Sequence, residues 1–160
     1  MKAATINEIK QELTSLPPHK LAELCLRLAR YKNDNKELLT YLLFEASDEA
    51  AYIQTVKNEI DSEFTGLPKP NLYLTKKSLR KILRSLAKYI RHTGSKQAEA
   101  ELLIYFCVKI KESRIRIQDS PVLVNLYRQQ LKKIHAAVES FHEDLQYDYL
   151  KEIKQLDFIG

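Results

Sequence analysis

The sequence predicts an all-α fold of about eight helices, arranged as stacked antiparallel hairpins in an irregular α–α superhelix, with a compact bundle as the alternative. Two observations predict it. The 160 residues contain only 3 Gly and 5 Pro, too few for an all-β chain that turns every 8 to 12 positions. Leu, Lys, Glu, Ala and Gln are plentiful, and apolar residues recur three and four positions apart, which is typical of amphipathic helices.

Length and composition favour one helical domain over residues 1–160, with possible halves at 1–64 and 72–160 joined by the Gly- and Pro-containing loop 65–71. The hydrophobic fraction of 44% and the charged fraction of 29% are ordinary for a soluble domain. The N-terminus has no apolar segment of the signal-peptide type, and no run approaches 18 apolar residues. We therefore expect a cytoplasmic protein that does not enter a membrane.

The first two helices are predicted around a pair of prolines. Thr5 to Glu8 match a capping box, which starts a short helix over residues 6–15. Pro17 and Pro18 end it, and a second helix follows over about 18–32. The buried faces expected for these helices are formed by Ile6, Ile9 and Leu13, and by Leu21, Leu24, Cys25 and Leu28.

Two more helices are predicted before the 65–71 loop. Residues 33–35, Asn-Asp-Asn, indicate a turn, and a third helix is expected over 36–46. Ser47 is expected to cap a fourth helix that reaches about Phe64. The expected inward residues are Leu38, Leu39, Leu42 and Leu43 on the third helix, and Tyr52, Ile53, Val56 and Ile60 on the fourth.

A strongly basic helix is predicted over about 75–93, with Thr75 as its N-cap and Gly94 at its C-terminal end. Leu79, Ile82, Leu83, Leu86 and Ile90 form one apolar stripe. The candidate binding residues lie on the opposite side: Lys77, Arg80, Lys81, Arg84, Lys88 and Arg91. Residues 64–96 carry nine Lys or Arg and no Asp or Glu, whereas residues 1–63 have a net charge of −3 and residues 97–160 a net charge of −1.

Three further helices are predicted after Gly94. The first, over about 96–113, is apolar nearly all round, which indicates the most buried helix of the fold. Ser120 and Pro121 start the next, which is expected to bend or stop around Phe141 and His142. A final helix is predicted from the spacing of Leu145, Tyr149, Leu150, Ile153 and Leu156.

The sequence also shows a likeness to known proteins in three places. These are the helix–proline–helix start followed by Leu21-Ala-Glu-Leu-Cys-Leu-Arg-Leu, the segment Phe64-Thr-Gly-Leu-Pro-Lys-Pro before a basic helix, and the apolar helix around Ala100 to Lys109. In these features the chain resembles an uncharacterised bacterial family of unknown function. The resemblance implies an all-helical fold of antiparallel helix pairs in a bacterial cytosol, and it implies no activity. The sequence has no strict repeat, so a HEAT-like or armadillo-like stack would be irregular.

The sequence offers no candidate catalytic residue, no cofactor-binding motif and no metal site. Three isolated glycines exclude the phosphate-binding loops. His135, Glu139, His142 and Glu143 have metal-like spacing on a continuous helix, but the favoured interpretation is a solvated polar face. Cys25 and Cys107 have apolar neighbours and are expected to be small core residues, with a disulfide or redox pair as the alternative.

The function expected from the sequence is therefore non-enzymatic. The basic helix is predicted to bind an acidic macromolecular partner, most simply a protein, within a helical-repeat-like scaffold. The alternative is nucleic-acid binding by the same residues, with Tyr73 and Tyr89 available to stack on bases if they are exposed. A charged helix face can also be simply solvated, or paired with the acidic first half of the chain.

Overall fold

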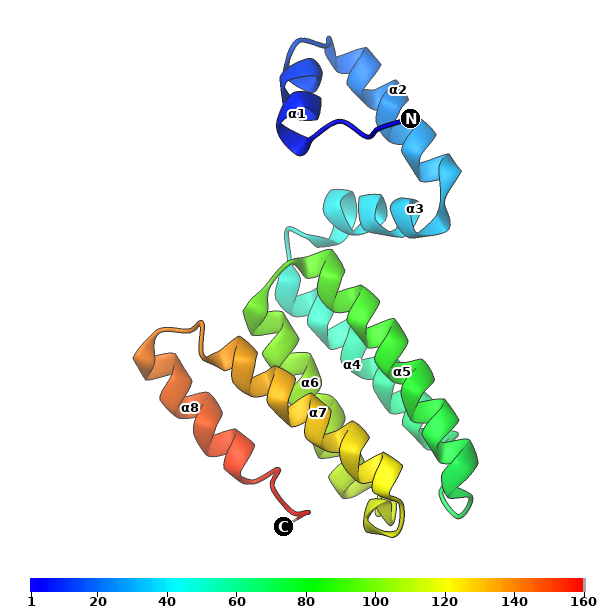
Figure 1. Ribbon diagram of the computed structural model, residues 1–160, viewed down its shortest axis with the longest axis vertical. Helices are drawn as coiled ribbons and strands as arrows, with labels where there is room; N and C mark the ends of the chain where they lie inside the picture. The colour runs from blue at the N-terminus through cyan, green and yellow to red at the C-terminus, as the bar shows by residue number, and fades with distance from the viewer. Residues whose placement is uncertain (160) are drawn as a thin grey trace. The chain divides into compact units, whose positions relative to one another are not determined.

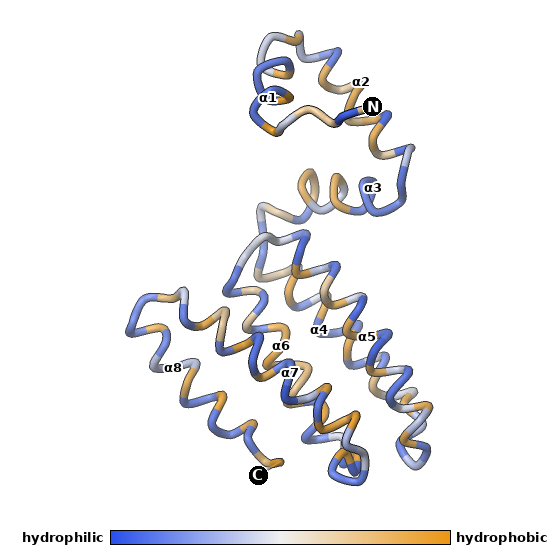
Figure 2. The backbone as a smooth tube through the Cα atoms, in the orientation of Figure 1, coloured by the Kyte–Doolittle hydropathy of each residue, from blue (hydrophilic) through white to orange (hydrophobic). Residues whose placement is uncertain are grey.

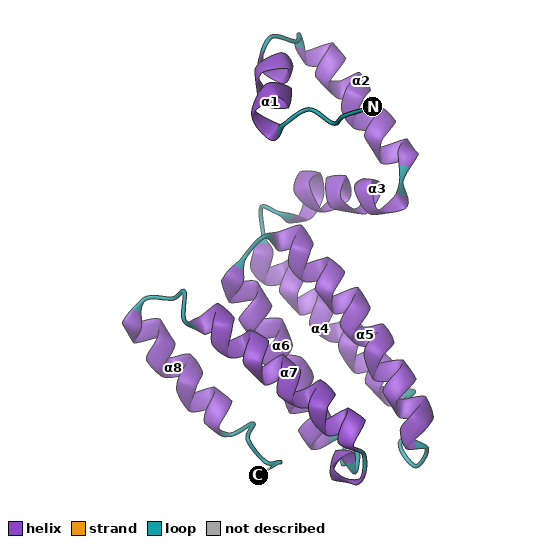
Figure 3. Cartoon of the chain, in the orientation of Figure 1, coloured by secondary structure: helices purple, strands orange, loops and turns teal. Residues whose placement is uncertain are grey.

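The computed structural model describes residues 1–159, and within them it is all-helical, with eight α-helices and no strand (Figures 1 and 3). The chain divides into two compact units, Met1–Ser47 and Asp48–Gly160. The boundary follows Ser47, whereas the sequence placed a possible division at the 65–71 loop. The helices on either side of that loop pack together inside the second unit.

The first unit contains α1 (Ile6–Thr14), α2 (Pro18–Tyr31), α3 (Asn33–Thr40) and a one-turn π-helix over Tyr41–Glu45. The predicted capping box is present, since Thr5 accepts a hydrogen bond from the Glu8 N–H and the Glu8 carboxylate accepts one from the Thr5 N–H. The turn predicted at residues 33–35 is wrong, because these residues form the first turn of α3. The single helix predicted over 36–46 is instead the end of α3 followed by the π-helical turn.

The predicted burial of the first three helices is also wrong. Among residues 1–47, only the Tyr41 side chain is buried, and Ile6, Leu28 and Leu43 are all more than half exposed. Figure 2 shows hydrophobic positions running along α2 and α3. The two helices pack on each other, but 47 residues provide too little apolar surface to enclose a core of their own.

The second unit contains α4 (Glu49–Thr65), α5 (Leu72–Thr93), α6 (Lys96–Glu112), a 3-10 turn over Ile117–Asp119, α7 (Pro121–Val138) and α8 (Glu143–Lys154). Helix α6 packs against α4, α5 and α7, and α8 packs against α7 (Figure 1). Leu102, Phe106 and Cys107 of α6 are 0% exposed. The prediction that this helix is the most buried of the fold is therefore confirmed.

The helix ends of the second unit follow from local hydrogen bonds. Asp48, and not Ser47 as predicted, caps α4 by accepting a bond from the Ala51 N–H. Ser120 caps α7 as predicted, and Pro121 occupies its first turn. Gly94 ends α5 with φ of 61°, the left-handed conformation that favours glycine.

Candidate functional site

Helix α5 begins one turn earlier than the sequence indicated. Asn71 is the N-cap and accepts a hydrogen bond from the Leu74 N–H at 3.1 Å. Thr75, the predicted cap, is buried at 0% exposure and donates its hydroxyl hydrogen to the Pro68 carbonyl at 2.9 Å. Thr75 therefore ties the preceding loop to the helix.

The apolar stripe of α5 packs into the second unit, with Leu79, Ile82 and Leu86 buried. The six basic residues predicted to bind a partner have different neighbours in the structure. Lys81 lies 3.7 Å from the Glu63 carboxylate of α4, and Lys77 lies 5.1 Å from the centre of the exposed Tyr73 ring. Lys88 is half-buried and has an interaction partner within the protein.

The other three basic residues lie on the flank of α5 that faces α7. Arg80 and Arg84 line a groove of about 440 Å³ between the two helices, whose other wall carries Lys133. The remaining residues that line this groove are neutral: Leu83, Val122, Asn125, Leu126, Gln129 and Gln130. Three cations therefore line one cavity. None of the described residues that line it is a carboxylate, so no acidic lining residue offsets their charge. We call this the α5–α7 groove.

A second pocket of about 260 Å³ continues the α5–α7 groove and shares Leu83, Gln130 and Lys133 with it. Arg91 lines this pocket, together with Glu99 of α6. The Glu99 carboxylate accepts a hydrogen bond from Lys96 at 2.9 Å, which offsets part of its charge. The basic surface therefore extends along α5 from Arg80 to Arg91, and among the described residues that line the two pockets Glu99, at the Arg91 end, is the only carboxylate.

Gln130 lies where the two pockets meet and is 3% exposed. Its Nε2 donates to the Leu126 carbonyl at 3.1 Å. Its Oε1 is buried and has no hydrogen-bond partner among the described residues. A buried acceptor without a donor costs free energy, so Gln130 is a candidate for a role other than stability.

The α7 side of the groove was not predicted from the sequence. Leu126, Gln130 and Lys133 have the spacing of one helix face, and this was the available signal. The sequence alone does not show that this face of α7 lies opposite Arg80 and Arg84, because both helices are placed by their packing on α6.

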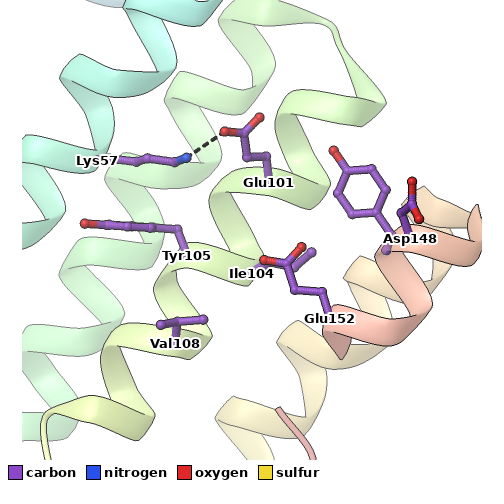
Figure 4. A pocket seen from close by; sticks show the side chains of 8 residues that line it. Lys57, Glu101, Ile104, Tyr105, Val108, Asp148 and Glu152 are labelled. Carbon is purple, nitrogen blue, oxygen red and sulfur yellow. Dashed lines mark hydrogen bonds and ion pairs between the residues drawn. The ribbon is translucent and has the colours of Figure 1, made fainter. Parts of the chain in front are cut away.

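A separate acidic pocket of about 400 Å³ lies between α4, α6 and α8 (Figure 4). Glu101, Asp148 and Glu152 line it, and Lys57 contacts Glu101 at 2.6 Å. Beside it, the Tyr105 hydroxyl donates to Asp61 at 2.7 Å. Burial, and then the bond to Asp61, raise the pKa of Tyr105 to about 12, so this phenol stays protonated at neutral pH.

The hydrogen bond from Tyr105 also lowers the pKa of Asp61, which contacts Lys109 at 3.0 Å. These groups link α4 to α6 through charge-assisted bonds. The raised pKa of Tyr105 and the lowered pKa of Asp61 follow from burial and from the hydrogen bond between them, so they carry no argument for catalysis.

The metal-like spacing predicted on one continuous helix does not form, because α7 ends at Val138. His142 lies outside it and caps α8, with Nδ1 accepting a hydrogen bond from the Asp144 N–H at 3.4 Å. His135 remains on the exposed side of α7. Within residues 1–159, no group of three or more His, Cys, Asp or Glu is arranged to hold a metal ion.

Both cysteines are free thiols, and they differ in environment. Cys107 is buried as predicted, and burial raises the pKa of its thiol to about 12. A thiol with that pKa is a poor nucleophile at neutral pH. Cys25 is exposed, so the prediction that it lies in a core is wrong. It is exposed because the apolar face of α2 is not covered.

No protein family model, curated protein or solved structure matches the chain. Among the helices described, none is long and apolar enough to cross a membrane.

Proposed function

We propose that this protein is a non-enzymatic helical scaffold of the cytoplasm that binds an acidic protein partner in the α5–α7 groove. One observation carries the proposal: Arg80, Arg84 and Lys133 come from two helices to one groove whose described lining contains no carboxylate. Like charges held together cost free energy, and that cost is repaid when anionic groups enter between them.

The groove also suits a folded or extended peptide better than it suits a single small anion. Apolar Leu83, Val122 and Leu126 line the groove together with the cations, and its asparagine and glutamine side chains can supply further hydrogen bonds. A protein segment that presents Asp or Glu beside apolar residues matches this mixture. Apolar contact would add affinity to a charge interaction that mainly provides orientation and association rate.

Nucleic-acid binding remains the alternative, and Tyr73 favours it. This ring is 59% exposed at the start of α5, with Lys76 and Lys77 beside it, as a base-stacking platform would be. Two observations weigh against it. Tyr89, the other candidate for stacking, donates its hydroxyl hydrogen to Glu59 at 2.6 Å, and Lys81 is already near Glu63.

The test measures binding of the full chain to fluorescent poly-L-glutamate, duplex DNA and single-stranded RNA by anisotropy, from 20 to 150 mM NaCl. The matched variants are Lys133→Glu, which places a carboxylate in the α5–α7 groove, and Lys132→Glu, which makes the same charge change on the exposed side of α7. Both alter the net charge equally, so any difference between them reports the location of binding.

We expect poly-L-glutamate to bind, Lys133→Glu to weaken it by about tenfold or more, and Lys132→Glu to weaken it by about twofold or less. Equal losses in the two variants would show that the groove is not the site. Binding to nucleic acid alone, with log K falling by about 0.9 per neutralised phosphate for each tenfold rise in salt, would favour the alternative. No binding at 20 mM NaCl would refute both functions.

A further inference from the structure

The first unit leaves two apolar stripes uncovered. Ile6, Ile9 and Leu13 form one on α1, and Leu24, Leu28 and Tyr31 form the other on α2, and all six side chains are exposed. Each set has helical spacing, so each occupies one face of its helix. Isolated helices of 9 and 14 residues are marginal in water. Helix α2 also packs on α3 within the first unit, and a surface that covered the two stripes would stabilise both helices further.

We infer that a second copy of this chain covers them. In this arrangement the α1–α2 hairpins of two copies pack face to face as four helices, and α1 of each copy lies against α2 of the other. The inference is independent of the function proposed for the α5–α7 groove, because it rests on residues 1–47. Two properties indicate a second copy as the occupant: the charges of the two helices and the area of the stripes.

The two helices carry net charges of opposite sign. Helix α1 has two acidic residues, Glu8 and Glu12, and one basic residue, Lys10. Helix α2 has one acidic residue, Glu23, and three basic residues, which are Lys20, Arg27 and Arg30. The net charge is thus −1 on α1 and +2 on α2. A two-fold axis brings α1 of each copy to α2 of the other, so the favourable pairing occurs twice.

The whole first unit is also nearly neutral, with seven Lys or Arg and six Asp or Glu in residues 1–47. The first units of two copies can therefore approach each other with little mutual repulsion. A partner of strong opposite charge would find no excess charge to bind on this unit, whereas the net charge of +4 on residues 48–160 would attract it elsewhere.

The uncovered area is sufficient for a stable dimer. The exposed fractions of the six side chains add up to about three and a half fully exposed residues. Aromatic side chains bury roughly 150–250 Å² each, so at the lower end of that range the stripes offer on the order of 500 Å² of apolar surface per copy. A standard interface buries about 800 Å² per partner, of which somewhat more than half is apolar. The two stripes alone thus supply the apolar share of such an interface.

The experiment uses the full chain in sedimentation velocity between 1 and 100 µM. We expect a species of twice the 18.7 kDa chain mass. Leu28→Glu changes a side chain that is 59% exposed, and Tyr147→Glu on α8 changes one that is 61% exposed. The first variant is expected to raise the dissociation constant by about 100-fold or more, since two unpaired carboxylates would enter the interface. The second is expected to change it by less than about threefold.

Circular dichroism checks that both variants keep the helix content of the parent chain. A monomer at 100 µM would overturn the inference. A dimer that Leu28→Glu leaves intact would also overturn it, because the copies would then associate through another surface.

Cys25 provides a second measurement on the same face. It lies between Leu24 and Leu28 and is exposed, whereas Cys107 is buried and does not compete for the reagent. Maleimide labelling of Cys25 is expected to slow by about tenfold or more when the concentration rises above the dissociation constant. An unchanged labelling rate in a chain shown to be dimeric would place the interface elsewhere and overturn the inference.

Discussion

Replacing Gln130 with leucine is expected to stabilise the second unit. Gln130 is 3% exposed on α7, and its Oε1 has no hydrogen-bond partner among the described residues. Its Nε2 donates to the Leu126 carbonyl. In an α-helix that carbonyl also accepts the backbone N–H of residue 130. The change Gln130→Leu therefore removes an unpaired acceptor and leaves the Leu126 carbonyl with its helical bond.

The magnitude follows from these opposing contributions. An unpaired buried polar atom costs about 1–3 kcal/mol, and the lost Nε2 bond contributes about 1 kcal/mol. Leu83 and Leu103 line the adjoining pocket with Gln130, so a leucine side chain there gains apolar contact. We expect the free energy of unfolding to rise by about 1–2 kcal/mol. For a unit of this size that corresponds to a melting temperature about 3–8 °C higher.

Urea and thermal unfolding, followed by circular dichroism, measure the change. The matched control is Gln129→Leu, the same substitution at the neighbouring exposed residue of the groove, which is expected to alter stability by less than about 0.5 kcal/mol. A Gln130→Leu protein that is less stable than the parent, with an unchanged m-value, would refute the reasoning. It would mean that Oε1 is satisfied by ordered water in the groove.

Two further predictions concern tyrosines, one buried (Tyr127) and one half-buried (Tyr105). Tyr127→Phe removes the hydroxyl that donates to the Leu156 carbonyl at 2.7 Å, so urea unfolding should show a loss of about 1–2 kcal/mol, and an unchanged midpoint would contradict this. The pKa of Tyr105 is raised from 10.0 to about 12 in the folded protein. The unfolded chain therefore loses this proton first, and the free energy of unfolding should fall as pH rises from 10 towards 12. Tyr105→Phe should make that fall shallower in denaturation series at pH 8 to 11.5, and an identical slope would show that Tyr105 does not contribute.

The elements of the second unit were largely predictable because its helices are covered by one another. The apolar residues of α6 occur nearly all round the helix, and a helix of that kind has to be central. Ser120 before Pro121 correctly marked the start of α7, and Gly94 the end of α5. The cap of α5 was misplaced because Thr75 has the right chemistry for a cap and the right spacing for the core, and the structure uses it in the core.

The candidate site was predictable only in part. The charge count identified Arg80, Arg84 and Arg91, since no Asp or Glu occurs from residue 64 to residue 98. It did not separate these residues from Lys81, which lies near Glu63, and it missed Lys133. Whether a basic residue of α5 lies in the groove or near Glu63 depends on which flank of α5 faces α7 and which faces α4. That is a property of tertiary packing, to which composition and periodicity are insensitive.

The first unit shows the limit of periodicity most directly. The stripe of α2 and the stripe of α5 look alike in sequence, yet Leu28 is 59% exposed and Leu86 is 1% exposed. Periodicity reports that a helix has an apolar face and does not report which surface covers it. The two proposed interactions also differ in their physical basis, because one depends on charge and the other mainly on the burial of apolar side chains. Salt screens the cations of the α5–α7 groove and so weakens the binding of an acidic partner. Salt does not weaken the burial of apolar stripes, so the dimer should persist at ionic strengths that release the partner.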